Sequence, residues 1–441
     1  MNNYYLLIFY NMVSLPKSFK LDEPIPSLPE GANGCLISCR PISSSTFGAG
    51  GVIDVDLGTR GWLDPKSLAI RYTMAVTAGA TQTAMIGTPC YTPFNRLSIT
   101  ANGTTIDSIS QFNQVAHVLT TGSMDVASKF GRQFAYGYSN TQPAVTTIQN
   151  LDARVSAAAG ADTFSVACPL PCLLSNSEKS LPLFAVGNMR LTFTIDTLAN
   201  MFAVGATLVT GPYVIPTGFV ISNFEVVYNM IDLGAEVERM VKGMGPRLFL
   251  KSHSYNNSAT AVSVGTTGSQ SFVFNQRYSS IRSAFLLPNL TIGSKWAEIV
   301  DITANAGDYQ LQIGNSAYPQ MPLSALNNKG GILQETYRAF GNLYDNNSMS
   351  IDGGEFQITS STLVAGLNPY EPGKFIVGQN LEKCQNNDHV LMSGISTYNS
   401  PISAVINMPT ATVGLCNLNL MLDYDSIIVI DQESKQLSVR S

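Results

Sequence analysis

Apolar and polar residues alternate with a period of two along much of the chain, which is the pattern of half-buried β-strands. One clear example is the apolar face formed by Leu68, Ile70, Tyr72 and Met74, while Arg71 points the other way. The same pattern predicts strands at Val52–Leu57, Arg96–Thr100, Met189–Ile195, Phe219–Ile231, Ser271–Phe274, Ile281–Leu287, Tyr309–Ile313, Glu355–Thr359 and Leu418–Tyr424. Turns rich in Gly, Pro and Asn separate these segments, so the pattern predicts an all-β sandwich.

Three segments have helical spacing instead. Apolar side chains recur every three or four positions over Ile109–Leu119 and over Leu333–Tyr344, which predicts two amphipathic helices with one apolar stripe each. Each stripe is expected to lie against a sheet. A third helix is predicted at Ala235–Lys242, where Gly243 and Pro246 end it. We place the boundary between two domains at this third helix.

The order of the elements repeats at a distance of roughly 200 residues, the size of one domain. In Arg96–Leu119 a strand, the hairpin turn Asn102–Gly103, a second strand and a helix follow one another. Tyr309–Leu323 and the helix after it show the same order, and each half closes on a long alternating strand. The sequence therefore predicts two tandem eight-stranded jelly rolls with short accessory helices. The expected parts are an N-terminal segment (1–44), a first jelly roll (45–234), a linker helix (235–246) and a second jelly roll (247–441).

Charge is scarce along the whole chain. Charged residues make up 12% of the sequence, about half of the ~25% of an ordinary soluble domain. Burying a charge is costly, so such a surface suits a protein whose faces are covered by copies of itself. The net charge is −5, and residues 1–30 contain only Lys17 and Lys20 as cations. Without a basic arm to neutralise phosphates, we expect no direct tight binding of nucleic acid.

No catalytic, cofactor-binding or metal-binding constellation is recognisable. The odd number of cysteines, seven over a long chain, favours reduced thiols over a disulfide framework. Two Cys pairs have C-x₃-C spacing and three histidines are far apart, which does not match the usual zinc spacings; these residues are Cys35, Cys39, Cys168, Cys172, His117, His253 and His389. A phosphate-binding G-x-x-x-x-G-K-[ST] loop and a G-x-S-x-G elbow are both absent from the sequence. We therefore expect no catalytic residue, no cofactor and no bound metal, and a protein that is not an enzyme.

Several stretches, in their joint order, resemble the double jelly-roll major capsid proteins, the lineage of adenovirus hexon, virophage and polinton-like virus capsids. The stretches are Gly50–Met74, Asn275–Ser283, Tyr309–Leu323 with the helix that follows, Phe375–Cys384 and Met392–Ile402. The resemblance implies a homotrimer whose six jelly rolls form a pseudo-hexagonal tile of an icosahedral virion shell, assembled inside the host cell. It implies neighbouring capsomers, penton proteins and minor capsid proteins as partners. Long insertions at Met124–Asp162 and Lys251–Gly268 are the candidates for outer towers.

Residues 1–16 form an uncharged, strongly apolar segment that includes the run Tyr4–Tyr10. It is shorter than a membrane span and lacks the basic region and cleavage site of a signal peptide. In the resembling capsids the N-terminus lies on the inner face, so a neighbouring capsomer, a minor capsid protein or an internal membrane are candidates to cover it. An extra strand or helix packed on its own domain is the alternative.

A receptor- or glycan-binding β-sandwich, such as a viral spike or a lectin-like module, is the main competing function, because jelly rolls serve both purposes. The tandem repeat and the low charge favour the shell protein. A lectin would more often carry aromatic clusters on exposed loops, and this chain has only Trp62 and Trp296 as tryptophans.

Overall fold

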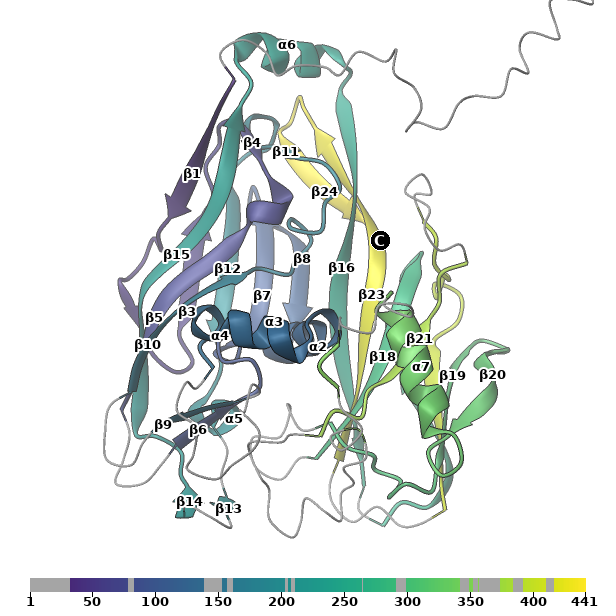
Figure 1. Ribbon diagram of the computed structural model, residues 1–441. Coiled ribbons are helices and arrows are strands. Elements are labelled where there is room, and N and C mark those ends of the chain that lie inside the picture. The colour runs from purple at the N-terminus through teal and green to yellow at the C-terminus, as the bar shows by residue number, and fades with distance from the viewer. Residues whose placement is uncertain are drawn as a thin grey trace, which may run out of the picture.

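A computed structural model gives the fold of the chain (Figure 1). It describes residues 32–441 except 78–82, 139–152, 157–161, 203–204, 208–210, 264, 291–298, 342–348, 352–355, 357–372, 384–391 and 410–415. The described chain is built mainly from antiparallel sheets that form two jelly rolls side by side. The predicted strand at Glu355–Thr359 lies outside the described residues apart from Phe356.

Eight strands make up the first jelly roll: β1 (Asn33–Cys39), β3 (Val52–Asp56), β5 (Ala69–Thr77), β7 (Phe94–Ala101), β8 (Thr104–Ser110), β10 (Asp162–Pro169), β12 (Met189–Ile195) and β15 (Gly218–Asp232). One sheet has the order β3-β12-β7-β8, and the facing sheet has the order β10-β5-β15-β1. Short strands β2 (Thr46–Phe47), β4 (Trp62–Leu63) and β11 (Leu181–Pro182) extend the second of these sheets.

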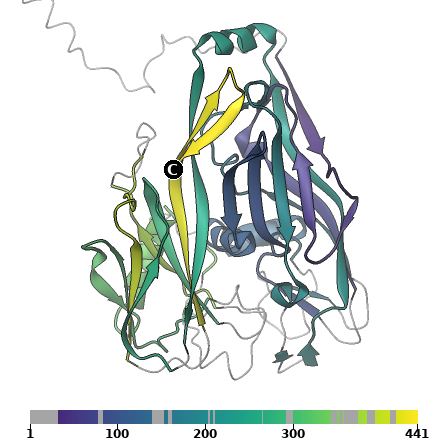
Figure 2. The ribbon, with the colours of Figure 1, turned by 180° about the vertical axis from the view of Figure 1, so that it is seen from behind.

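The second jelly roll uses β16 (Arg247–Val262), β17 (Gly268–Phe274), β18 (Ile281–Leu290), β19 (Asp308–Ile313), β20 (Ser316–Ser324), β21 (Val377–Asn380), β22 (Ile402–Met408) and β23 (Cys416–Asp431). Its sheets have the orders β17-β22-β19-β20 and β21-β18-β23-β16. These orders match those of the first jelly roll strand for strand, so the predicted tandem repeat of eight strands is confirmed. Figure 2 shows β23 and its hairpin partner β24 (Gln436–Arg440) from behind.

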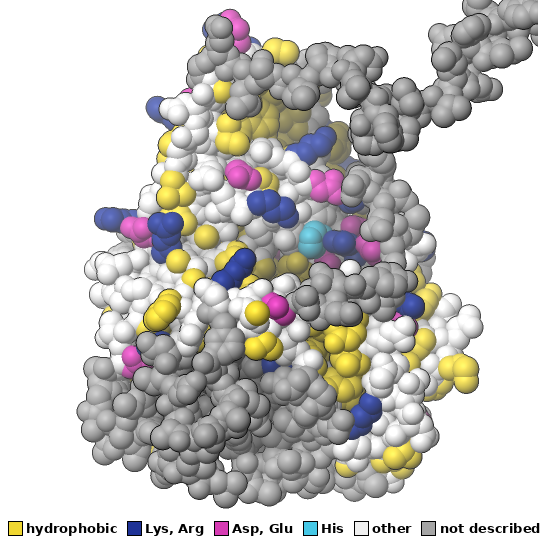
Figure 3. Space-filling model, in the orientation of Figure 1, with side chains coloured by type: hydrophobic (Ala, Val, Ile, Leu, Met, Phe, Trp, Pro, Cys, Tyr) yellow, Lys and Arg dark blue, Asp and Glu magenta, His cyan; other side chains and the backbone are white. Residues whose placement is uncertain are grey.

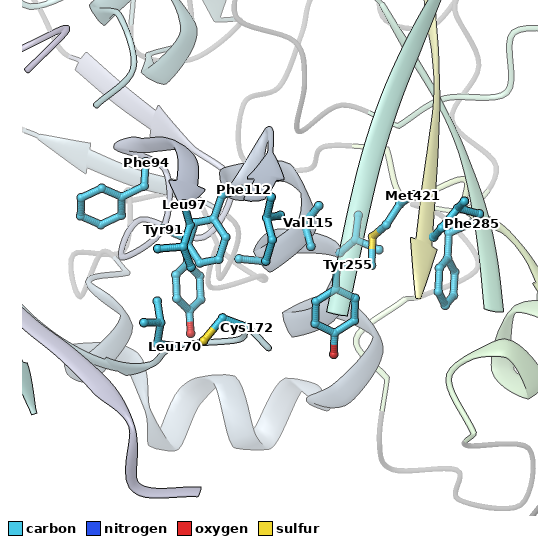
Figure 4. Packing of buried hydrophobic residues seen from close by; sticks show 14 of the residues in the cluster. Tyr91, Phe94, Leu97, Phe112, Val115, Leu170, Cys172, Tyr255, Phe285 and Met421 are labelled. Carbon is cyan, nitrogen blue, oxygen red and sulfur yellow. The ribbon is translucent and has the colours of Figure 1, made fainter. Parts of the chain in front are cut away.

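The predicted alternation places the core between the facing sheets. In β12, every second side chain from Met189 to Ile195 is buried, while the side chains between them are half-buried. Phe193 packs edge-on against Phe224 of β15 with ring centroids 5.2 Å apart, and Phe94 of β7 lies 5.3 Å from Phe193. Buried apolar residues form one cluster that continues from the first jelly roll into the second (Figure 4).

The helices lie at three places. The helix α6 (Ala235–Gly243) connects β15 to β16 across one end of the molecule (Figure 1), as predicted from the sequence. Helices α2 (Phe112–Ser123) and α7 (Lys329–Ala339) follow β8 and β20 in their respective jelly rolls. The smaller elements are α3 (Val126–Gly131), α4 (Gln133–Tyr136), α5 (Leu198–Met201), η3 (Pro65–Ser67), η4 (Leu183–Ala185) and the two-stranded pairs β6 (Thr83–Ile86) with β9 (Ala153–Ser156) and β13 (Gly205–Thr207) with β14 (Gly211–Tyr213). No described helix has the length and apolarity that a membrane crossing requires.

The structure corrects two predictions. Ile109 belongs to β8, and α2 is buried almost all round instead of along one stripe, because it lies between the two jelly rolls. The segment Lys251–Gly268 is not an insertion that builds a tower. Most of it lies in β16, which pairs with β23 along its whole length. Of the other tower candidate, Met124–Asp162, the described part contains α3, α4 and β9, and residues 139–152 and 157–161 lie outside the description.

Candidate functional site

The residues that were weighed as metal ligands do not come together. His117 is buried in α2, where its Nδ1 lies 3.0 Å from Thr88 Oγ1. His253 lies on β16 with Nδ1 2.8 Å from Asp423 Oδ1, and His389 is outside the described residues. Within the described ranges, no three His, Cys, Asp or Glu side chains are arranged to hold a metal ion. The six described cysteines are Cys35, Cys39, Cys90, Cys168, Cys172 and Cys416, and all are free thiols.

The most elaborate polar arrangement lies at the junction of the two jelly rolls. Gln111, just before helix α2, and Gln114, within it, lie next to β16, where Asn257 Nδ2 donates to both amide oxygens at 2.7 Å. Gln114 Nε2 donates in turn to Asn289 Oδ1 of β18 at 3.1 Å, and Asn419 Nδ2 of β23 donates to the same oxygen at 2.7 Å. This junction network is almost fully buried, so each lost partner would leave a polar group without water to replace it.

Asp107 is the ionisable member of the junction. It lies on β8 and is 6% exposed, and its Oδ2 accepts a hydrogen bond from Ser254 Oγ of β16 at 2.7 Å. The backbone N–H of Ser108 donates to its other oxygen at 2.9 Å. Burial raises the pKa of Asp107 to about 6, although the hydrogen bonds from Ser254, from Ser108 and from the backbone of Leu173 act in the opposite direction. The carboxyl therefore titrates at the contact between the two jelly rolls.

Backbone contacts fix the same junction on both sides of Asp107. Ser252 Oγ of β16 donates to the carbonyl oxygen of Leu173 at 2.5 Å, and Asn176 Nδ2 donates to the carbonyl oxygen of His253 at 3.1 Å. Nearer the α6 end, Asn102 Nδ2 donates to the carbonyl oxygen of Lys435 at 2.7 Å. Asn102 occupies the predicted hairpin turn with a φ of 49°. Through this hydrogen bond it contacts the turn between β23 and β24, which contains Lys435. The two jelly rolls are thus held to each other at several levels along their strands.

The helices contribute a further contact between the halves. Gly122 in α2 lies so close to Phe340, just after α7, that an added Cβ would be 2.2 Å from its ring. Ser350 N also donates to the carbonyl oxygen of Thr121 at 3.1 Å. Glycine at position 122 lets the ring of Phe340 approach the helix this closely, and any side chain there would make the ring move.

A group of charged side chains lies beside the junction in the second jelly roll. Arg282 Nε of β18 pairs with Glu382 Oε1 at 2.9 Å, and its Nη1 lies 3.7 Å from Asp423 Oδ2. Burial by itself would raise the pKa of Asp423, but His253 and Arg282 hold it below its ordinary value. Buried Asp425 accepts from Ser280 Oγ at 2.6 Å. These contacts tie β16, β18 and β23 together.

One surface cavity of about 350 Å³ opens between α2, α4 and the loop after β10. Leu119, Met124 and Leu170 give it an apolar wall, and among the described residues of the lining only Lys66 and Arg132 are charged. The hydroxyl of Tyr91, also in the lining, already donates to the carbonyl oxygen of Pro169 at 2.6 Å. This lining holds no convergent set of polar groups of the kind that fixes a small-molecule ligand.

The sequence did not reveal the junction network. In the sequence, nothing distinguishes the polar residues Gln111, Gln114 and Asn257 from surface residues. Their hydrogen-bond partners lie more than 140 positions away in the chain, so no local pattern shows them. The only available signal was that Gln114 lies in a helix flanked by a strongly apolar stripe. Neither that pattern nor the spacing of the amides identifies which strand they contact.

Comparison with known proteins gives matches at the level of structure only. No protein-family model matches the chain, and no curated protein matches it by sequence. The crystal structure of VP54 of the virus PBCV-1, fitted into a reconstruction of the virophage Sputnik, superposes with a TM-score of 0.60 at 11% identity, covering 93% of this chain and 97% of that one. The Faustovirus major capsid protein gives a TM-score of 0.59 at 9% identity, covering 96% and 94%. The mavirus major capsid protein gives a TM-score of 0.51 at 9% identity, and the match covers 97% of this chain and 95% of that one.

The likeness extends over almost the full length of both partners in each case, and it includes both jelly rolls. Identities near 10% are too low to transfer individual residues, but the strand order and the coverage establish the architecture. This chain therefore has the double jelly-roll fold that is found in these viral capsid proteins.

Proposed function

We propose that the protein is a major capsid protein whose trimers form pseudo-hexagonal tiles of an icosahedral virus shell. The observation that carries the proposal is the strand-for-strand duplication of an eight-stranded jelly roll within one chain. Three copies around a threefold axis present six similar units, which fill a hexagonal lattice position. PBCV-1 VP54, the Faustovirus protein and the mavirus protein, which share this fold, are capsid components.

The junction between the jelly rolls supports the same function. A hexagonal tile requires a fixed angle between the two units of each chain, since a flexible hinge between them would not keep six units in pseudo-sixfold symmetry. The buried amides Gln114, Asn257, Asn289 and Asn419, together with Asp107, supply that fixed angle. Buried hydrogen bonds are directional, so they favour one arrangement of the two units more strictly than apolar packing alone.

We propose further that residues 45–234 and 247–441 act as the two units and 235–246 as their connection, with Asn33–Cys39 of the N-terminal segment contributing β1 to the first sheet. The protein acts in the virion and not as an enzyme. Its first partners are copies of itself. Penton proteins and minor capsid proteins stay predictions. An internal membrane reached by residues 1–16 also stays a prediction, because residues 1–16 lie outside the described residues.

A receptor- or glycan-binding role gains no support from the surface. Among the described residues, the exposed large aromatic side chains Phe134, Phe249 and Tyr398 lie on α4, on β16 and in the loop before β22. They are spread over separate elements and make no aromatic platform of the kind that stacks on a sugar ring.

Light scattering after size exclusion tests the proposal. We expect a molar mass of three chains that persists on dilution to low micromolar concentration. A protein that stays a single chain at the highest soluble concentration would show that the fold is used for something other than a trimeric tile.

A further inference from the structure

Two buried thiols meet inside the first jelly roll. Cys168 lies near the end of β10, opposite Ile70 of β5, and Cys90 lies in the loop between β6 and β7. Cys168 is 1% exposed and Cys90 is 0% exposed. Their side chains hydrogen-bond to each other, and both cysteines are free. A disulfide forms without a large backbone movement only between side chains that are already this close.

Hydrogen bonds hold the two chain segments together around the thiols. Tyr72 of β5, the strand that pairs with β10, donates through its hydroxyl to the carbonyl oxygen of Cys90 at 2.8 Å. Tyr91, the next residue in the loop, donates to the carbonyl oxygen of Pro169 at 2.6 Å. Pro169 directly follows Cys168. The loop is thus fixed to the sheet on both sides of the pair, and the thiols stay in contact in the folded chain.

The surface cavity of about 350 Å³ brings small molecules close to this pair. Tyr91 and Pro169 both line it, and the hydroxyl of Tyr91 makes a hydrogen bond with the side chain of Cys168. The ring of Tyr91 points toward the segment that carries Leu170 (Figure 4). On the face of the molecule that carries α2, α3 and α4, hydrophobic side chains lie among a few Lys and Arg side chains (Figure 3). A small uncharged molecule in the cavity is therefore separated from the thiols by one side chain.

We propose that Cys90 and Cys168 are a site of oxidative modification, at which a small peroxide such as hydrogen peroxide joins the two thiols as a disulfide. In the first step, the sulfur of one cysteine attacks a peroxide oxygen as its thiolate. The O–O bond breaks, hydroxide leaves and a sulfenic acid forms. In the second step, the sulfur of the other cysteine attacks the sulfenic sulfur, the S–O bond breaks, the S–S bond forms, and water leaves with the thiol proton. The two thiols are oxidised by two electrons, and the peroxide is reduced to two molecules of water.

The surroundings of the pair make the first step slow and the second step fast. Burial raises the pKa of the Cys90 thiol well above its ordinary value, because a thiolate at this place would lose its water. The thiolate is the reactive form, so the pair stays reduced in the presence of weak oxidants. Once one sulfur has become a sulfenic acid, the second thiol is already in contact with it. The disulfide therefore forms before further oxidation to a sulfinic acid.

The disulfide joins the two ends of the segment 91–167, which contains α2, α3 and α4. Closing such a loop lowers the entropy of the unfolded chain and so stabilises the fold. Helix α2 carries Gln114 of the junction network, so the crosslink secures the segment that holds the two jelly rolls together. The timing rests on the proposed function: the host cell keeps the thiols reduced during assembly, and a released virion meets an oxidising environment.

Peptide mapping of the purified full-length protein tests the inference. The folded protein is treated with hydrogen peroxide, the remaining thiols are alkylated in denaturant, and the chain is digested with trypsin without reduction. Trypsin releases Cys90 within residues 72–96 and Cys168 within residues 155–179. We expect mass spectrometry to find these two peptides joined, with two hydrogens fewer than their sum. Fragment ions that separate Cys168 from Cys172 identify which of the two carries the bond.

Cys35 is the matched control, because it is exposed on β1 and Cys39 lies four residues further along the same strand, about 13 Å away. The same treatment should oxidise Cys35 without linking it to Cys39. The variants Cys90→Ser and Cys168→Ser each leave one thiol without its partner. In each variant the remaining cysteine of the pair should accumulate sulfinic acid in place of the disulfide.

The melting temperature gives an independent readout. The disulfide should raise it by about 5 °C, and dithiothreitol should reverse the shift. The variant Cys35→Ser should show the same shift, because Cys35 takes no part in the bond. Free thiols at Cys90 and Cys168 after a treatment that oxidises Cys35 completely would overturn the inference. Sulfinic acid at both positions of the wild type, or a bond between Cys168 and Cys172, would overturn it as well.

The peptide map and the oligomeric state separate this inference from the proposed function. If the linked peptides form in a protein that stays a single chain, the modification site stands and the proposed function fails. If trimers form and the two peptides never join, the modification site is wrong and the capsid proposal stands.

Discussion

Asp107→Asn is the sharpest perturbation of the junction between the jelly rolls, because it removes the titrating charge while it keeps the size of the side chain; the change from an acceptor oxygen to an amide NH₂ does not depend on pH. In the folded protein, burial raises the pKa of Asp107 from 3.8 to about 6. The native state then holds a proton more tightly than the unfolded chain, and stability falls as the pH rises through the window from about 4 to about 6. At 1.36 kcal/mol per pKa unit, the full loss is about 3 kcal/mol above neutral pH.

The measurement is the free energy of unfolding of both proteins between pH 4 and pH 8, at one chain concentration because an oligomer's stability depends on it. Other groups titrate as well: Asp423, whose pKa is held low, stabilises the fold above its ordinary pKa and loses that effect as the pH falls. Such contributions are common to both proteins and cancel in the difference. We expect the difference between wild type and Asp107→Asn to change by about 2 kcal/mol over this range, to the disadvantage of wild type at high pH.

Ser254→Ala is the companion variant, since it keeps the carboxylate and removes the hydroxyl that lowers its pKa. Without that donor the pKa of Asp107 rises further, and the pH window moves upward. Parallel stability curves for wild type and Asp107→Asn, or a window that moves down in Ser254→Ala, would refute the reasoning that a desolvated carboxyl lies at the junction.

Three further predictions concern packing, the amide network and nucleic acid. Gly394→Ala should lower the free energy of unfolding by about 2 kcal/mol or more, because its new Cβ would lie 2.0 Å from the carbonyl oxygen of Ile281, whereas Gly131→Ala meets nothing within 4 Å and should be neutral in the same urea titration. Asn289→Ala removes the shared acceptor of two buried amide donors and should cost about 3 kcal/mol; a loss under 1 kcal/mol would mean that water replaces the amide. Fluorescence anisotropy with random single- and double-stranded DNA should show no submicromolar, salt-sensitive binding, and such binding would contradict the argument from the missing basic arm.

Local sequence patterns correctly predicted elements such as β12 and α6, whose own apolar spacing and end residues define them. The strand Met189–Ile195 was predicted with the bounds that β12 has, because one of its faces meets the core and the other does not. The helix α6 was located from the Gly and Pro residues that end it. The order of these elements was then enough to predict the duplication.

The predictions failed where distant parts of the chain meet. The segment from Lys251 to Gly268 looked like an insertion because it is rich in Ser, Thr and Val. In the fold, Ser252, Ser254 and Asn257 are buried and bind the first jelly roll. These polar side chains make hydrogen bonds to the first jelly roll, and the local spacing of apolar residues does not predict such a contact. The same contact explains why α2 is buried on more than its apolar stripe.

Electron microscopy of the purified full-length protein tests the central claim most directly. The account predicts threefold particles with a pseudo-hexagonal outline, in which six jelly-roll units of similar size surround the axis. Particles of one chain, or rings of any other symmetry, would contradict it.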